Sequence, residues 1–152
     1  MVHRSPATPQ RRRALQALAV GACMLLVRPA VATREQLEAA LRETFGTSLI
    51  ERDRVQLKLP LLAESGNVVP VTVSVDSPMT HADHVSAIHL FAEKNHLPRV
   101  LSVQLGPWNG KAVVKSRIRL AESQQVLAVA VMSDGSLFSA VADVEVTFSS
   151  CG

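Results

Sequence analysis

The chain has 152 residues, 47% of them apolar and 19% charged, which is enough to form one domain with its own core. Its formal net charge is +3, but five of the 16 basic residues and none of the 13 acidic ones lie before residue 33. Without that segment the charge is 11 minus 13, or −2. A nucleic-acid-binding function then loses its electrostatic support.

The first 32 residues have the order of a cleaved export signal. Arg11-Arg12-Arg13 precede a mostly apolar run over 14–27, and Ala30-Val31-Ala32 provides a small-x-small cleavage site. The run has 14 residues, whereas a spanning helix needs roughly 20, so we expect no permanent membrane anchor. We predict a signal of the twin-arginine type over 1–32 and a periplasmic location, with general secretion as the alternative route.

The segment after residue 32 predicts one short helix followed by strands. Apolar residues recur at helical spacing over 34–45, up to Gly46. Beyond the helix, apolar and polar residues alternate between turns rich in Gly, Asn, Asp and Pro. The predicted strands are 55–59, 69–75, 85–91, 100–105, 112–120, 126–132 and 137–148. About seven short strands at regular spacing predict an all-β, immunoglobulin-like antiparallel β-sandwich domain over 33–148.

A group of histidines raises the question of a metal site. Four fall within 16 residues: His81, His84, His89 and His96. On the strand 85–91, His89 shares a face with Val85 and Phe91, while the turns at either end hold other members of the group. One strand and two loops would not bring four ligands together, so we expect structural or solvated histidines and no metal cofactor.

Trp108 is the only tryptophan and lies in a Pro-Trp-Asn-Gly turn. Two roles are open for it. Its ring either covers one end of the sandwich, which we expect, or anchors a binding partner.

The strongest functional signal is Cys151, the single cysteine that remains after the predicted signal. A blue-copper site is excluded, because it needs a histidine and an axial ligand after the cysteine and only Gly152 follows. Fully extended, residues 149–152 span roughly 13 Å, so the thiol can enter a pocket in another protein. We predict no catalysis by this chain alone, but a mobile carrier arm over 149–152 with a covalent attachment point at Cys151.

A different interpretation of the same tail is that its thiol is incidental or forms a dimer. The chain would then be a non-catalytic periplasmic module that binds another protein. Replacing Cys151 separates the two interpretations, since only a carrier depends on the sulfur atom.

Several segments, in this order, follow a known pattern: VVPVTV at 68–73, MT at 79–80, DHV at 83–85, IH at 88–89, FAEKN at 91–95, RIRL at 117–120, SDGS at 133–136 and CG at 151–152. In these residues the chain resembles the SoxY family, the sulfur-carrier subunits of the periplasmic thiosulfate-oxidising system. The resemblance extends over nearly all of the chain after the predicted signal. It implies an immunoglobulin-like sandwich that forms a heterodimer with a SoxZ subunit.

The resemblance also implies a cargo and a set of partner enzymes. Cys151 matches the family's sulfur-bearing cysteine. A haem protein conjugates thiosulfate to it oxidatively, a metal-dependent hydrolase releases sulfate, and a molybdenum enzyme with its cytochrome oxidises the remaining sulfane. The family usually ends Gly-Gly-Cys-Gly-Gly, whereas here Ser149 and Ser150 replace the leading glycines and one trailing glycine is absent. Serine is bulkier and less flexible than glycine.

Overall fold

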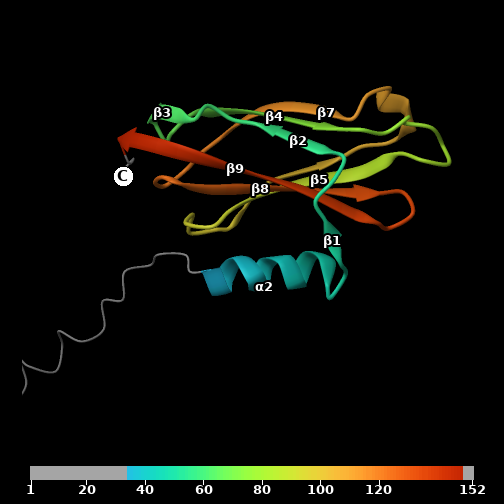
Figure 1. The fold of residues 1–152 in the computed structure, drawn as a ribbon, viewed down its shortest axis with the longest axis horizontal. Helices are drawn as coiled ribbons and strands as arrows, with labels where there is room; N and C mark the ends of the chain where they lie inside the picture. The colour runs from blue at the N-terminus through green and yellow to red at the C-terminus, as the bar shows by residue number, and fades with distance from the viewer. Residues whose placement is uncertain (1–33, 149–152) are drawn as a thin grey trace, which may run out of the picture. The chain divides into compact units, whose positions relative to one another are not determined.

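The structure is a computed structural model that describes residues 34–148. This part of the chain forms one α-helix and nine strands, in two sheets that pack face to face (Figure 1). The elements are α2 (Arg34–Phe45), β1 (Ile50–Glu51), β2 (Val55–Lys58), β3 (Leu62–Ser65), β4 (Val69–Val75), β5 (Val85–Ala92), β6 (Arg99–Gln104), the 3-10 turn η1 (Pro107–Asn109), β7 (Val113–Ile118), β8 (Gln124–Met132) and β9 (Leu137–Phe148). The export signal predicted over 1–32 lies outside the described residues.

The larger sheet has the strand order β1-β9-β8-β5-β6, with β3 also paired to β9, and the smaller sheet has the order β2-β4-β7. The predicted all-β sandwich with one short helix is confirmed, and all seven predicted strands are present. β1 and β3 are additional, and both run parallel to β9, whereas the other pairs are antiparallel. The sequence did not reveal them because β1 has only two residues and β3, with the sequence Leu-Ala-Glu-Ser, does not alternate between apolar and polar residues.

The helix α2 begins and ends where the apolar spacing predicts. Exposed ion pairs join Glu38 to Arg34 and Arg42, each four residues away along the helix. The helix ends at Gly46, which adopts a φ of +65° and donates its amide to the Arg42 carbonyl at 2.8 Å. No residue of α2 is fully buried, but its apolar side chains Leu37, Ala40, Leu41 and Phe45 are partly buried against the larger sheet.

Two groups of apolar side chains hold these layers together. The main core lies between the two sheets and includes the inward-facing Val69, Val71, Val73 and Val75 of β4. A smaller core lies between the larger sheet and α2, where Phe91, Val129 and Leu137 are buried under the apolar side of the helix. The larger sheet is therefore covered on both faces, whereas α2 leaves the outer face of the smaller sheet uncovered (Figure 1).

Strand β5 serves both cores because its alternation is interrupted. The pairing of β5 with β8 shifts register between Val85 and Ala87, which reverses the face on which the following side chains lie. Val85 consequently faces the main core and Phe91 faces α2. The prediction that these two residues share a face with His89 was therefore wrong for Val85, since sequence alternation alone does not reveal a bulge.

Within the part of the chain that the structure describes, no helix is long and apolar enough to cross a membrane.

Candidate functional site

The carboxyl end of β9 is fixed on one side by β3. The two strands run parallel, with Leu62 opposite Glu145. The Glu145 amide donates a hydrogen bond of 2.9 Å to the carbonyl of Leu61. The Thr147 hydroxyl donates one of 3.0 Å to the carbonyl of Glu64. β9 is thus attached to its neighbour up to its last described residues.

Ser123 fixes the same strand end from the other side. The Val146 amide donates to Ser123 Oγ at 2.8 Å, and the Ser123 hydroxyl donates to the Val146 carbonyl at 3.3 Å. These bonds extend the ladder between β8 and β9, in which Gln124 lies opposite Val144. Because β9 is bonded along both edges, the sandwich gives the chain that follows a fixed point of departure.

The predicted site residues Ser149, Ser150, Cys151 and Gly152 lie outside the described residues. What the structure places is the base of the predicted arm, at the end of β9 (Figure 1). The attachment role of Cys151 therefore stays a prediction.

The surface beside this strand end is acidic. The side chains of Glu64 on β3 and of Asp143 and Glu145 on β9 are exposed. Glu122 lies in the turn before β8. It forms an ion pair with Lys94, with 3.1 Å between Glu122 Oε1 and Lys94 Nζ. Exposed charges act over a screening length of about 10 Å at moderate salt. These exposed carboxylates therefore give the surface around the end of β9 a negative potential.

The histidines lie in separate surroundings. His84 Nδ1 is 3.0 Å from the carbonyl oxygen of Thr80, and His89 Nδ1 is 2.8 Å from Ser102 Oγ. The other two are exposed in turns. Among residues 34–148, no three His, Cys, Asp or Glu side chains are placed to hold one metal ion.

His89 takes part in the packing of α2 on the larger sheet. Its ring lies edge-on to Phe45 of the helix, with centroids 5.4 Å apart, and 6.4 Å from the ring of Phe91. Burial lowers the pKa of His89 below its ordinary value of 6.5, and the nearby charge of Arg99 lowers it further. The neutral imidazole is thus favoured, which suits a structural role.

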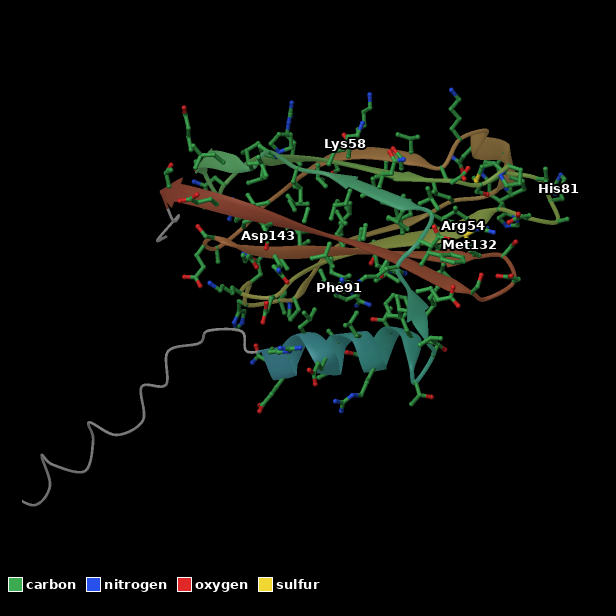
Figure 2. The ribbon with its side chains drawn as sticks, viewed as in Figure 1. Arg54, Lys58, His81, Phe91, Met132 and Asp143 are labelled. Atoms are coloured by element: carbon green, nitrogen blue, oxygen red, sulfur yellow. The ribbon has the colours of Figure 1, made fainter. Side chains whose placement is uncertain are left out.

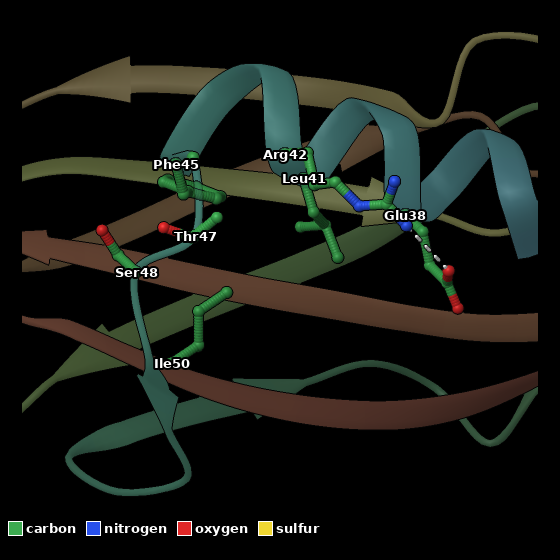
Figure 3. Close-up of a pocket in the computed structure, with 8 residues that line it drawn as sticks. Glu38, Leu41, Arg42, Phe45, Thr47, Ser48 and Ile50 are labelled. Atoms are coloured by element: carbon green, nitrogen blue, oxygen red, sulfur yellow. Dashed lines mark hydrogen bonds and ion pairs between the residues drawn. The ribbon is translucent and has the colours of Figure 1, made fainter.

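A shallow depression lies beside α2 (Figure 3). Its lining residues are Glu38, Leu41, Arg42, Phe45, Gly46, Thr47, Ser48 and Ile50. Ile50 pairs with Leu137, the first residue of β9. At about 3.3 Å per residue along a strand, this point is roughly 35 Å from the strand end where the predicted arm begins. The depression is therefore no part of the arm's surroundings.

Trp108 does not cover the end of the sandwich, so that prediction was wrong. Its side chain is 83% exposed in η1. The ring lies against Gly106, where a Cβ atom would collide with it. The short 3-10 turn directs the ring outward, a geometry that the Pro-Trp-Asn-Gly sequence alone does not specify.

A basic surface on the smaller sheet was not predicted from the sequence. Lys58 of β2 and Lys115 and Arg117 of β7 lie exposed on its outer face. The spacing of Lys115, Arg117 and Arg119 by two residues was a usable signal, because alternate residues of a strand point to the same face.

Comparison with known proteins agrees with this fold. The family model of the sulfur oxidation protein SoxY matches residues 41–151. The sulfur carrier protein SoxY from Chlorobium limicola f thiosulfatophilum is 32% identical, with a TM-score of 0.63, over 76% of this chain and 100% of that one. No curated protein sequence gives a significant match.

Two superoxide reductases share the fold at lower identity. The neelaredoxin from Ignicoccus hospitalis is 19% identical over 77% of this chain and 95% of that one, with a TM-score of 0.56. The enzyme from Nanoarchaeum equitans is 12% identical over 63% of this chain and 100% of that one, with a TM-score of 0.52. At these identities the likeness concerns architecture alone.

The sandwich and the matched residues define a β-sandwich protein of sulfur oxidation. The chain belongs to the SoxY family.

Proposed function

We propose that this chain is a periplasmic sulfur carrier of thiosulfate oxidation, which holds sulfur intermediates covalently on Cys151. The observation that carries the proposal is the family match, which extends to residue 151 and so includes the cysteine itself. The similar Chlorobium protein is a sulfur carrier. The anchored end of β9 supports the same role, because an arm can present its cargo reproducibly only from a fixed base.

In this proposal, the first segment of the chain directs its export to the periplasm. Residues 1–32 act as a cleaved export signal, in which Arg11 to Arg13 direct the twin-arginine route. Residues 33–148 form the carrier domain and 149–152 the arm. In the periplasm, Cys151 is then the one thiol of the mature chain, so no second cysteine in the same chain can trap it in a disulfide.

Loading of the cysteine is an oxidation. The Cys151 thiolate and the terminal sulfur of thiosulfate form one S–S bond, and two electrons pass to a haem-containing partner. Hydrolysis of the resulting S-thiosulfonate by a partner hydrolase consumes one water, releases sulfate and two protons, and leaves a persulfide on Cys151. A sulfane-oxidising partner then acts on that persulfide. The carrier itself supplies no catalytic group to these steps.

The acidic surface at the end of β9 fits such a cargo. Both the S-thiosulfonate and the persulfide are anions near neutral pH, and Asp143 and Glu145 repel anions. In this proposal, the repulsion disfavours contact between the loaded cysteine and its own domain. A SoxZ-like subunit completes the carrier as a heterodimer in this proposal, and the chain needs no cofactor of its own.

Thiosulfate-dependent oxygen uptake tests the proposal in cells that lack the native gene and express variants of it. We expect Cys151→Ser to abolish the uptake, because no sulfur atom remains to accept the cargo. Ser149→Ala, a matched change in the same tail, keeps the thiol and is expected to retain the uptake. Normal uptake with Cys151→Ser would instead favour a protein-binding module with an incidental thiol.

A further inference from the structure

The outer face of the smaller sheet carries a compact group of basic side chains. Thr72 in the middle strand lies opposite Lys58 on one side and Lys115 on the other. In the next row, Pro70 lies opposite Arg117. Adjacent strands are about 4.8 Å apart, and alternate residues of one strand about 7 Å apart. Three positive charges therefore share a patch roughly 10 Å across, which we call the basic face.

These charges have no acidic counterpart on their own sheet. The sequences of β2, β4 and β7 contain no Asp or Glu. Among the residues that the structure describes, the ion pairs are Arg34–Glu38, Arg42–Glu38 and Lys94–Glu122, and none involves Lys58, Lys115 or Arg117. Lys58 on β2 and Lys115 on β7 lie on either side of β4, and like charges at this separation repel one another. An opposite charge from outside the domain would therefore stabilise this arrangement.

The basic face is a local feature, since the domain as a whole is acidic. Residues 34–148 contain 11 Lys and Arg and 13 Asp and Glu, a difference of −2. The strands of the larger sheet have the opposite sign, with four acidic residues (Glu51, Glu64, Asp143 and Glu145) and one basic residue, Arg99. Charge is thus segregated between the two sheets, and Figure 2 shows Lys58 projecting away from the sandwich while Asp143 lies on the larger sheet.

The surface between the charges suits close contact. A shallow depression follows β4 and β7, and Pro70, Thr72, Lys115 and Arg117 contribute to its lining. Val113, 43% exposed, lies on the same face opposite Ser74. Both outer strands of this sheet, β2 and β7, have a free edge within the described part of the chain. A partner would therefore contact a shallow surface that combines apolar, polar and positively charged side chains. Polar protein interfaces have this composition.

We propose that the basic face is a docking surface for a protein partner that presents acidic side chains. Complementary charge steers such a partner and fixes its orientation. Three positive charges on a domain of net charge −2 are too few to hold a nucleic acid or an anionic bilayer, which the rest of the domain repels. The partner is instead a folded protein with a few carboxylates placed opposite Lys58, Lys115 and Arg117.

The position of the basic face also determines what a bound partner leaves uncovered. β9 belongs to the larger sheet, so a protein on the outer face of the smaller sheet leaves the end of β9 uncovered. The partner can remain bound while other proteins act on residues 149–152. The inference concerns the outer face of the smaller sheet alone and does not depend on the chemistry of Cys151.

Site-specific photo-crosslinking in thiosulfate-grown cells tests this surface. A photoreactive residue replaces Gln56, an exposed residue of β2 on the basic face, in the full-length chain. We expect one protein adduct whose crosslinked peptide is rich in Asp and Glu. Combining Lys58→Gln, Lys115→Gln and Arg117→Gln should lower its yield at least tenfold, equivalent to about 1.4 kcal/mol of binding free energy.

The matched control removes three positive charges elsewhere, through Arg34→Gln, Arg42→Gln and Arg52→Gln. It should change the yield less than twofold, and thermal unfolding of both triple variants verifies that they fold. The adduct should persist with Cys151→Ser, which separates this inference from the carrier proposal. The proposal is overturned by the absence of an adduct, by an adduct with phospholipid or a second copy of the chain, or by equal losses in both triple variants.

Discussion

The two sheets of the sandwich share one core but differ on their outer faces. The larger sheet is covered by α2 and contains β9, whose end is bonded to β3 and Ser123. The smaller sheet is covered by no element of the described chain and carries Lys58, Lys115 and Arg117. A sandwich needs only its inner faces for stability. The difference between the outer faces is consistent with the two proposals, in which the end of β9 is the base of the carrier arm and the smaller sheet binds a partner.

The largest expected effect comes from the covered face of the larger sheet. Phe91 is fully buried beneath α2, and truncation of a buried aromatic ring costs about 3–5 kcal/mol. Phe91→Ala should lower the free energy of unfolding in urea by this amount. Thr72→Ala, at an outward position of the smaller sheet, should change it by less than about 1 kcal/mol. Equal losses would mean that the two outer faces do not differ in structural importance.

The base of the arm is the next most sensitive place. A Cβ atom on Gly66, between β3 and β4, would collide with the backbone carbonyl of Leu120. Gly66→Ala should therefore displace the β3 end and cost about 1–3 kcal/mol in urea unfolding. Hydrogen exchange at the Glu145 amide, which bonds to Leu61, should accelerate. Glu64→Ala, an exposed side-chain change nearby, should leave the exchange rate unaltered, and protection unchanged by Gly66→Ala would contradict the proposed anchoring by β3.

A smaller effect is expected from pH. The pKa of His89 is lowered in the folded chain, first by burial and then by Arg99. As pH falls below the ordinary value of 6.5, His89 gains a proton more readily in the unfolded chain than in the folded one. The free energy of unfolding therefore decreases as the pH falls from 6.5 to the lower pKa of the folded chain. His89→Phe should reduce the fall in unfolding free energy between pH 7.5 and 5.0. His81→Asn, at an exposed turn, should retain it, and identical pH profiles for all three proteins would show that His89 is not the group responsible.

The smallest effect on stability is expected at the basic face. Neutralising Lys58, Lys115 and Arg117 together removes like-charge repulsion and breaks no ion pair of the described residues. The free energy of unfolding should stay within about 0.5 kcal/mol of the wild-type value, or rise slightly. If this triple variant lost about 2 kcal/mol or more of unfolding free energy, the three side chains would be needed for the stability of the fold and not only for binding a partner.

Much of the fold could be predicted from the sequence, and the elements that could not be predicted have physical reasons for it. Period-two alternation located the seven main strands, and apolar spacing with Gly46 located α2, because burial of one face imposes those patterns. β1, β3 and the bulge after Val85 were missed, since very short strands and register shifts depend on pairing with distant residues. The orientation of Trp108 depends in the same way on the local turn.

The candidate site was predictable in one part and not in another. Cys151 stands out by its position in the sequence alone, and the family match includes it. The basic face needed the structure, because Lys58 is separated by 57 residues from Lys115, and only the pairing of both strands with β4 places them on either side of Thr72.

The central claim is that Cys151 carries thiosulfate-derived sulfur, and intact mass spectrometry tests it most directly. The chain without residues 1–32 is incubated with thiosulfate and a haem-containing partner oxidase, beside the Cys151→Ser variant, while reduction of the oxidase is monitored. We predict that the wild-type chain gains the mass of one thiosulfate-derived group and that the variant gains none. An unmodified wild-type chain in the presence of active oxidase, or the same adduct on the variant, would contradict the claim.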